Sequence, residues 1–206
     1  MIIARRVLPY GPNAAIIECR SIAEVHALCA YARSTFSAEL ADVVPGAATV
    51  TAIGTGPLDP EMLETLAVVH AEQIDTVPRT HTIEVTYDGQ DLDWVSAYLG
   101  RTPAEVVEMH TAQIWTVAFC GFAPGFGYLV GDPSMSIDVP RLDRPRRSVP
   151  AGSVALAGPW SAIYPRASPG GWRLIGHTTA VLWSASAERP ALLAPGDVVQ
   201  FREVHR

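Results

Sequence analysis

Arginines, glycines and aromatic residues gather in residues 119–178, and these residue types in this density suit a binding site. Arginine binds carboxylates and phosphates through paired hydrogen bonds. Glycine brings backbone N–H groups close to a ligand, as an oxyanion-type site requires. Aromatic side chains can exclude water. The stretch therefore predicts loops shaped for an anionic ligand, and the open alternative is a β-barrel that needs many tight turns.

Three segments carry these residues: 119–129, 140–154 and 163–178. Arg146, with Arg141 or Arg144, offers planar guanidinium forks. The alternatives are that the aromatics form barrel core and that the arginines are solvated or pair with nearby aspartates, Asp138 and Asp143. The candidate substrate-binding residues are Phe122, Pro124, Gly125, Phe126, Tyr128, Arg141, Arg146, Gly152, Ser153, Ser168, Gly170, Gly171 and Trp172.

Nucleophilic catalysis has no clear candidate in the chain. Ser153 and Ser168 do not lie in a G-x-S-x-G motif, so both are interpreted as turn or strand hydroxyls. His110 lies near the end of an expected helix and is interpreted as a core or surface histidine. The sequence therefore names no catalytic residue.

The composition excludes several mechanisms. All 15 basic residues among the 206 are arginine, so a lysine Schiff base and a complete P-loop are both impossible. The net charge of −6 argues against nucleic acid or an anionic membrane as the main partner. Any phosphate must be held by arginine, by backbone N–H groups or by a partner.

The cysteines and histidines show no metal-binding pattern. Cys19, Cys29 and Cys120 lie in apolar surroundings, which indicates buried, reduced thiols. The six histidines form neither HxH nor HExxH, so no metal site is expected. The N-terminus lacks a signal-peptide pattern and no apolar run approaches bilayer length. We expect a soluble, cytoplasmic protein.

Residues 1–88 are expected to form a small α+β domain. Ser21-Ile22-Ala23-Glu24 predicts a capping box that starts one helix. Asp59-Pro60 predicts the start of a second helix, which runs to about Ile74. Two helices on one face of a sheet indicate a ferredoxin-like sandwich without chemical motifs, suited to packing, dimerisation or partner docking. Strands are expected at residues 2–8, 14–18, 48–53 and 81–87.

Residues 89–206 are expected to form a β-barrel domain, with the boundary in the polar turn Asp88-Gly89-Gln90. A helix over 92–99 ends at Gly100, and a capping box at Thr102-Pro103-Ala104-Glu105 starts the next helix. Short strands separated by tight turns then predict a closed barrel. These strands are expected at residues 114–119, 153–157, 161–164, 172–176, 180–183 and 198–204.

The motifs GFAPGFGYL, PRLDRPRRSVPAGSVALAG and IYPRASPGGWRLIGHT resemble the signature of the KipI / allophanate hydrolase subunit 1 family. Members of this family include the B subunit of the ATP-dependent 5-oxoprolinase. The resemblance implies a small N-terminal domain, a cyclophilin-like barrel, and a partner of the C type (KipA, or allophanate hydrolase subunit 2), together with an A-type subunit. It also implies a site for ATP with Mg that the partner subunit completes. The reaction that it implies is opening of the 5-oxo-L-proline lactam to glutamate.

The chain departs from the family pattern at three places. Ser148 stands where an arginine is common, Pro159-Trp160-Ser161-Ala162 replaces a glycine and Gln-Thr, and His177 replaces an arginine. Two other activities remain open: a KipI-like regulator that inhibits a sensor histidine kinase, and hydrolysis of allophanate or urea derivatives. The second is disfavoured because neither a Gly-Ser-Ser-rich amidase signature nor a biotin-site Met-Lys-Met is present. The leading prediction is a non-autonomous enzyme subunit.

Overall fold

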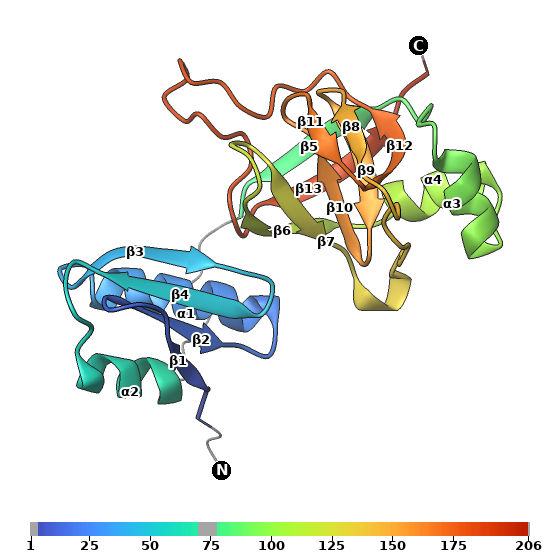
Figure 1. The fold of residues 1–206 in the computed structure, drawn as a ribbon. Helices are drawn as coiled ribbons and strands as arrows, with labels where there is room; N and C mark the ends of the chain where they lie inside the picture. The colour runs from blue at the N-terminus through green and yellow to red at the C-terminus, as the bar shows by residue number, and fades with distance from the viewer. Residues whose placement is uncertain (1–3, 70–77, 206) are drawn as a thin grey trace. The chain divides into compact units, whose positions relative to one another are not determined.

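The structure, a computed structural model, describes residues 4–69 and 78–205. The chain divides into two compact units, residues 1–77 and 78–206 (Figure 1). Both units mix helices with sheet, so the overall class is α+β, as the sequence predicts. No helix within the described ranges is long and apolar enough to cross a membrane.

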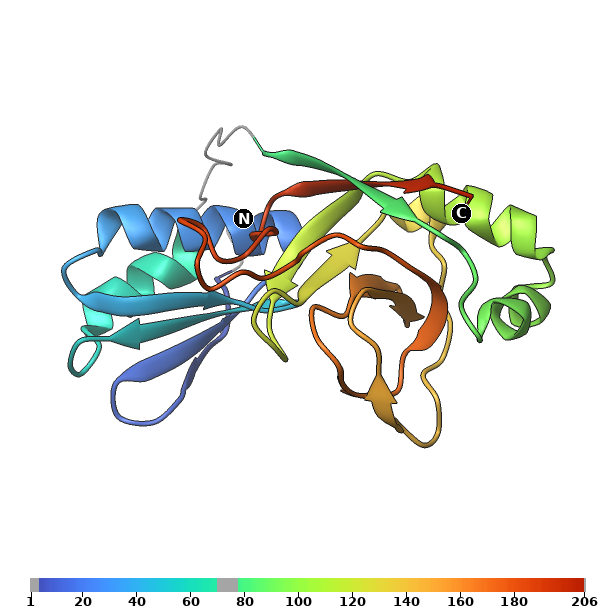
Figure 2. The same ribbon diagram turned by 90° about the horizontal axis from the view of Figure 1, so that it is seen from above.

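The first unit is a four-stranded antiparallel sheet in the order β1-β2-β4-β3, with both helices on one face (Figure 2). Alternate residues of the central strands point toward the helices, so Ile17 and Val50 share one apolar core with Leu28 and Leu66. The elements are β1 (Val7–Pro9), β2 (Ala14–Glu18), α1 (Ile22–Thr35), β3 (Leu40–Pro45), β4 (Thr49–Gly54) and α2 (Pro60–Val68).

Both predicted helix starts occur. Ser21 Oγ accepts a hydrogen bond from the Glu24 N–H at 3.1 Å, but the Glu24 carboxylate accepts from Arg20 N rather than completing the capping box. Asp59 caps α2 by accepting from Glu61 N at 3.0 Å. Helix α2 ends at Val68, before the predicted end near Ile74. Residues 70–74 of that predicted helix and residues 2–3 of the first expected strand lie outside the described residues.

The structure corrects two predictions for this half. Strand β3, which the sequence did not predict, pairs with β4, so the unit is two hairpins, each followed by a helix. This order differs from the βαββαβ order of a ferredoxin-like fold, which is not confirmed. The strand expected at 81–87 is β5 (Thr80–Val85), and it pairs in parallel with β13 (Val198–Glu203) in the second unit. The division therefore falls before Pro78 and not after Asp88.

The second unit is a barrel-like sheet of seven strands in the order β12-β9-β10-β7-β6-β13-β5. A bridge between Thr86 and His177 links its two edges, so the barrel is nearly closed. Besides β5 and β13, the sheet contains β6 (Trp115–Cys120), β7 (Gly127–Val130), β9 (Ser153–Ala157), β10 (Trp160–Ile163) and β12 (Arg173–His177).

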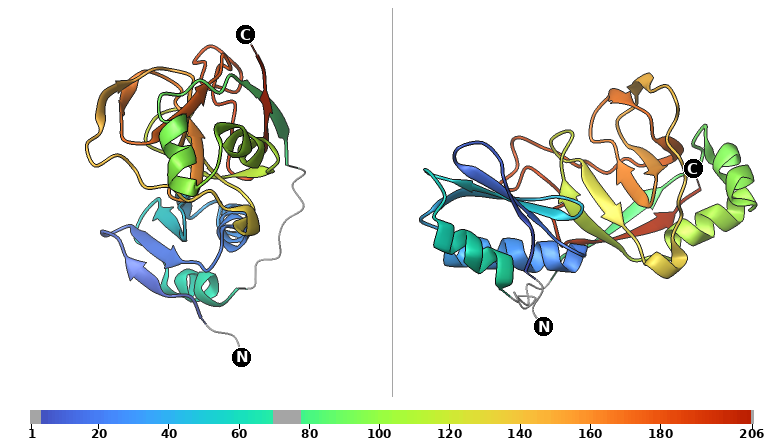
Figure 3. Two further views of the ribbon diagram at one scale, coloured as in Figure 1. Left: turned by 90° about the vertical axis from the view of Figure 1, so that its right-hand side faces the viewer. Right: turned by 60° about the horizontal axis from the view of Figure 1, so that its bottom comes forward.

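Shorter elements surround the barrel strands. Helices α3 (Leu92–Leu99) and α4 (Pro103–Thr111) lie outside the barrel (Figure 3). Strands β8 (Arg146–Val149) and β11 (Ser168–Gly170) form a two-stranded ribbon, and Pro133–Met135 form a 3₁₀ turn. The prediction of a strand at 180–183 is wrong. Among the described residues this segment makes one isolated bridge, from Trp183 to Ala191, and it joins no sheet.

The predicted end of α3 and the predicted start of α4 are confirmed. Gly100 ends α3 at φ 64°, and Thr102 and Glu105 form both halves of a capping box. His110 is fully buried at the end of α4, as the core interpretation expects. Its Nδ1 lies 2.7 Å from the Tyr87 hydroxyl and its Nε2 lies 2.8 Å from Ser161 Oγ. Burial disfavours the imidazolium and lowers the pKa of His110 to about 3.

The three cysteines are free thiols, as predicted. Cys19 and Cys29 are buried in the first unit, and Cys120 is half-buried in the barrel. Desolvation raises the pKa of each thiol to about 11, so all three are protonated at neutral pH and poor nucleophiles.

Candidate functional site

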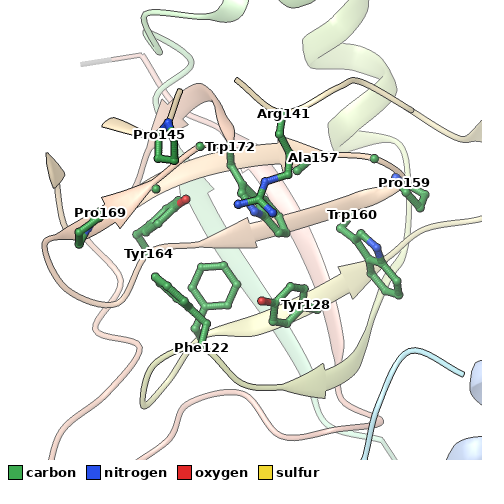
Figure 4. Close-up of a pocket in the computed structure, with 14 residues that line it drawn as sticks. Phe122, Tyr128, Arg141, Pro145, Ala157, Pro159, Trp160, Tyr164, Pro169 and Trp172 are labelled. Atoms are coloured by element: carbon green, nitrogen blue, oxygen red, sulfur yellow. The ribbon is translucent and has the colours of Figure 1, made fainter. Parts of the chain in front are cut away.

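A pocket of about 640 Å³ opens on the second unit (Figure 4). It lies between the turn before β7, the β9–β10 turn, the 141–145 loop and the segment around β11. Its walls are mainly aromatic, and its floor includes small residues at the end of β9. The lining residues are Phe122, Phe126, Tyr128, Arg141, Pro145, Ala157, Gly158, Pro159, Trp160, Tyr164, Pro169, Gly170, Gly171 and Trp172.

The aromatic wall is an interlocked cluster. Phe126 is buried and makes edge-to-face contacts with Tyr164 and Trp172, at centroid distances of 5.4 and 5.6 Å. Tyr128 contacts Trp172 in the same way at 5.6 Å. Because each ring is fixed by several others, the pocket shape is set by packing before a ligand arrives.

Arg141 supplies the positive charge of the pocket, and Figure 4 shows its guanidinium directed inward. Among the described residues, no carboxylate lies within 4.0 Å of this guanidinium. The neighbouring Leu142 N–H donates to Gly171 O at 2.7 Å, which ties the arginine loop to the opposite wall. Arg141 is therefore positioned to receive an anion from outside the chain.

Two tyrosine hydroxyls lie near this cation. Tyr164 and Tyr128 both line the pocket together with Arg141, and a phenol O–H can donate one hydrogen bond. Burial raises the pKa of Tyr164 and of Tyr128, and the charge of Arg141 opposes this rise. Both phenols therefore stay protonated at neutral pH and can donate a hydrogen bond to a ligand. A Cβ at Gly170 would overlap the Tyr164 hydroxyl, which explains the glycine at that position.

Seven of the thirteen predicted binding residues line this pocket, namely Phe122, Phe126, Tyr128, Arg141, Gly170, Gly171 and Trp172. Tyr164 and Trp160 were not predicted as binding residues, although Tyr164 lies in one of the quoted motifs. Trp160 is the first residue of β10 and the one residue of that strand that is not buried, and the strand carries no alternating pattern that could have indicated it. The predicted residues outside the lining are Pro124, Gly125, Arg146, Gly152, Ser153 and Ser168.

Arg146 is engaged within the barrel unit instead of facing the pocket. Its Nη2 lies 2.8 Å from both carboxylate oxygens of Asp91, and its Nη1 donates to Trp172 O at 3.1 Å. Asp91 also accepts from Leu174 N at 2.7 Å. The predicted anion fork is therefore used to fix the 168–172 segment behind the pocket. Asp91, and neither Asp138 nor Asp143, is the partner.

The other outlying residues have structural surroundings. Gly125 packs against Leu182 and Trp183, and the Gly152 N–H donates to Tyr164 O at 2.7 Å. The backbone amide of Gly152 is therefore already engaged and does not face a substrate. Ser153 is buried in β9, as the strand-hydroxyl interpretation expects, and Ser168 Oγ is buried without a hydrogen-bond partner among the described residues.

Residues 4–69 and 78–205 contain no assembled set of metal ligands. No group of three or more histidine, cysteine, aspartate or glutamate side chains in these ranges is placed to hold a metal ion. The pocket instead combines one guanidinium, two phenolic donors and aromatic faces. This arrangement suits a small anion with a flat or apolar body.

Comparison with known proteins gives the family. The family described as "Carboxyltransferase domain, subdomain C and D" matches residues 5–193. A protein of Escherichia coli O157:H7 that is named as the B subunit of 5-oxoprolinase is 39% identical over 167 residues, which is 78% of this chain and 76% of that protein. This chain belongs to the family of 5-oxoprolinase B subunits. The Haemophilus influenzae protein of the same name is 45% identical over 113 residues, 55% of this chain and 53% of that protein.

Solved structures support the fold of this family member. TTHA0988 has a TM-score of 0.79 at 30% identity, over 94% of this chain. This chain spans only 40% of the TTHA0988 chain and about half of the H. influenzae relative. Urea carboxylase of Kluyveromyces lactis has a TM-score of 0.75 at 18% identity, over 98% of this chain and 22% of that enzyme, which shows a shared fold alone.

Proposed function

We propose that this chain is the B-type component of an ATP-dependent 5-oxoprolinase-type complex, in which it binds 5-oxo-L-proline for opening to L-glutamate. The observation that carries the proposal is the Arg141 guanidinium, which has no carboxylate partner among the described residues, inside an aromatic pocket of this family member. The substrate is a small ring with one carboxylate. Arg141 fits the carboxylate, and the aromatic wall fits the ring.

The chemistry explains why such a pocket is needed. An unactivated lactam resists hydrolysis at neutral pH, so the amide needs a better leaving group or a strong nucleophile. ATP supplies activation by phosphorylating the lactam oxygen. The role proposed for this chain is to hold the carboxylate on Arg141, to donate hydrogen bonds from Tyr164 and Tyr128, and to keep water from the ring.

The site is incomplete for the whole reaction, which is why we propose partner subunits. Its donors fit one anionic group, whereas a triphosphate with Mg needs further cations and carboxylates. The chain has no lysine, and its described residues assemble no metal ligand set. We therefore assign the remaining phosphate and Mg contacts to a partner of the C type, and completion of ring opening to a partner of the A type.

The finer fold assignments belong to the same proposal. The second unit would be a cyclophilin-like barrel. The first unit would be a circularly permuted ferredoxin-like sandwich: moving β1 behind α2 gives the order βαββαβ and leaves the sheet order β1-β2-β4-β3 unchanged.

The test combines this chain with its A-type and C-type partners, ATP, Mg and 5-oxo-L-proline, and measures glutamate. Release of glutamate that requires all three proteins is the expected result. A matched preparation that carries Arg141→Ala separates a substrate-binding role from assembly, since it should assemble normally but need far more 5-oxoproline. Absence of glutamate from the complete mixture overturns the proposal, and inhibition of a sensor histidine kinase by this chain alone would favour the regulatory alternative.

A further inference from the structure

Phe122 has a backbone conformation that its side chain disfavours. Its φ is 66°, and among the described residues it is the only non-glycine residue with positive φ. The Ala123 N–H donates to Gly121 O at 2.7 Å across it, so Phe122 is the central residue of a γ-turn. The γ-turn with positive φ at its central residue is rare and strained compared with the inverse γ-turn, and a bulky residue at that position is an outlier.

Packing does not account for this strain. The residue Phe122 is 61% exposed and lines the pocket (Figure 4). Its contacts are edge-to-face, with Phe126 at 5.2 Å and Tyr164 at 6.4 Å. A phenylalanine retained for stability would be buried, whereas Phe122 is among the exposed large hydrophobic residues.

The turn itself does not need a phenylalanine. Gly121 N donates to Phe126 O at 3.1 Å and Phe126 N donates to Ala123 O at 3.0 Å, so backbone bonds close the loop on both sides. Gly125, at φ 82°, anchors the far side against Leu182 and Trp183. Glycine or asparagine would adopt the central conformation at lower cost. The ring is thus an added feature on a loop that is already fixed.

We propose that Phe122 covers the bound ligand by stacking its ring on the planar part of a small carboxylic acid whose anion pairs with Arg141. The edge contacts with Phe126 and Tyr164 hold the ring in place while leaving it open toward the pocket. Local strain of this kind is retained where the surrounding structure enforces it and function uses it. The ligand class rests on the proposed function, whereas the covering role of the ring does not.

The experiment compares Phe122→Asn, which tolerates the backbone conformation without the ring, with Phe122→Tyr, which retains the ring. Binding of 5-oxo-L-proline to the full chain is measured by calorimetry. We expect Phe122→Asn to weaken binding about 2- to 12-fold. Phe122→Tyr, which retains the ring, should bind as tightly as the wild type. The midpoint temperature of thermal unfolding of Phe122→Asn should equal that of the wild type or exceed it by up to about 4 °C, because the backbone strain is relieved. Tyr10→Asn, at a residue 62% exposed in the first unit, is the matched control and should leave affinity unchanged.

A second probe separates this inference from the proposed function. The fluorescent anion 8-anilinonaphthalene-1-sulfonate carries a flat naphthalene ring and reports on apolar pockets whether or not 5-oxoproline is the substrate. One outcome is that the wild type binds the dye but not 5-oxo-L-proline, and that Phe122→Asn lowers the affinity for the dye while Phe122→Tyr does not. In that case the proposed substrate is wrong and the covering role stands. The inference is overturned if Phe122→Asn leaves binding unchanged, if it unfolds well below the wild type, or if the wild type binds neither compound.

Discussion

Arg141 and Arg146 lie five positions apart in one motif, and their surroundings are opposite. Arg146 is largely buried and bonded to Asp91 and to the Trp172 carbonyl. Arg141 is exposed at the pocket and has no carboxylate partner in the described part of the chain. The same guanidinium chemistry therefore fixes the wall of the pocket at one position and faces its interior at the other. Residue type alone does not distinguish the two uses, because the difference depends on a partner distant in sequence.

The largest effect should come from breaking the buried pair. Asp91→Ala leaves the Arg146 guanidinium without its counterion in a site where the aspartate side chain is 9% exposed. Removing one partner of such a pair costs about 3–5 kcal/mol of unfolding free energy. Urea unfolding monitored by tryptophan fluorescence measures this loss for the second unit. The ligand pocket should also loosen, because Leu174 N loses its acceptor and Arg146, which donates to Trp172 O, loses the carboxylate that fixes it.

Arg141→Ala is the natural control for that experiment. Truncation of an exposed side chain of this kind should change stability by only about 0.5 kcal/mol. An Asp91→Ala variant as stable as Arg141→Ala would contradict the assignment of Arg146 to a structural role.

Arg141, in contrast to Arg146, should contribute most to ligand affinity and little to stability. A charge-assisted hydrogen bond to a carboxylate contributes about 1.5–3 kcal/mol, so Arg141→Ala should weaken 5-oxo-L-proline binding about 10- to 150-fold. Calorimetry on the full chain measures the change. Arg141→Lys should recover only part of the affinity, since an ammonium lacks the planar fork. Equal affinity in wild type and Arg141→Ala would show that the anion binds elsewhere.

The sequence predicted local features better than distant pairings. Strands β2 and β9 match their predicted bounds because their limits are set by adjacent turns. Strand β5 was assigned to the wrong unit because its partner β13 lies at the other end of the chain. Strands β8 and β11 were missed because they are short and contain proline or glycine or adjoin them, which suppresses a strand pattern.

The candidate site shows the same limit. Phe122, Tyr128 and Arg141, which the motif composition marked, line the pocket, and their role in binding stays a prediction. Arg146 was included for the same reason, and only the fold shows Asp91 beside it. Tyr164 was not predicted to line the pocket, because its ring reaches the pocket through its contact with Phe126, which lies in a different segment of the chain.

His110 offers a further test, because it is a buried polar link in the same unit and is not among the residues that line the pocket. The pKa of His110 is about 3 in the folded chain and ordinarily 6.5, so between these values the unfolded chain binds a proton that the folded chain does not. Stability is therefore complete above pH 6.5 and falls as the pH decreases from 6.5 toward 3, by up to about 1.4 kcal/mol per pH unit. Between pH 6.5 and 5.5 the expected loss is about 1 kcal/mol.

The measurement is urea unfolding across that pH range for the wild type and for His110→Gln, whose amide does not titrate. The variant is less stable at every pH if its amide fits the Tyr87 and Ser161 hydroxyls poorly, but its pH slope should be smaller than that of the wild type. Identical slopes would show that His110 does not control the pH dependence. Because Arg141 keeps its charge throughout this range, ligand affinity of the folded chain should change little while stability falls, which separates the buried polar link from the pocket by their responses to pH.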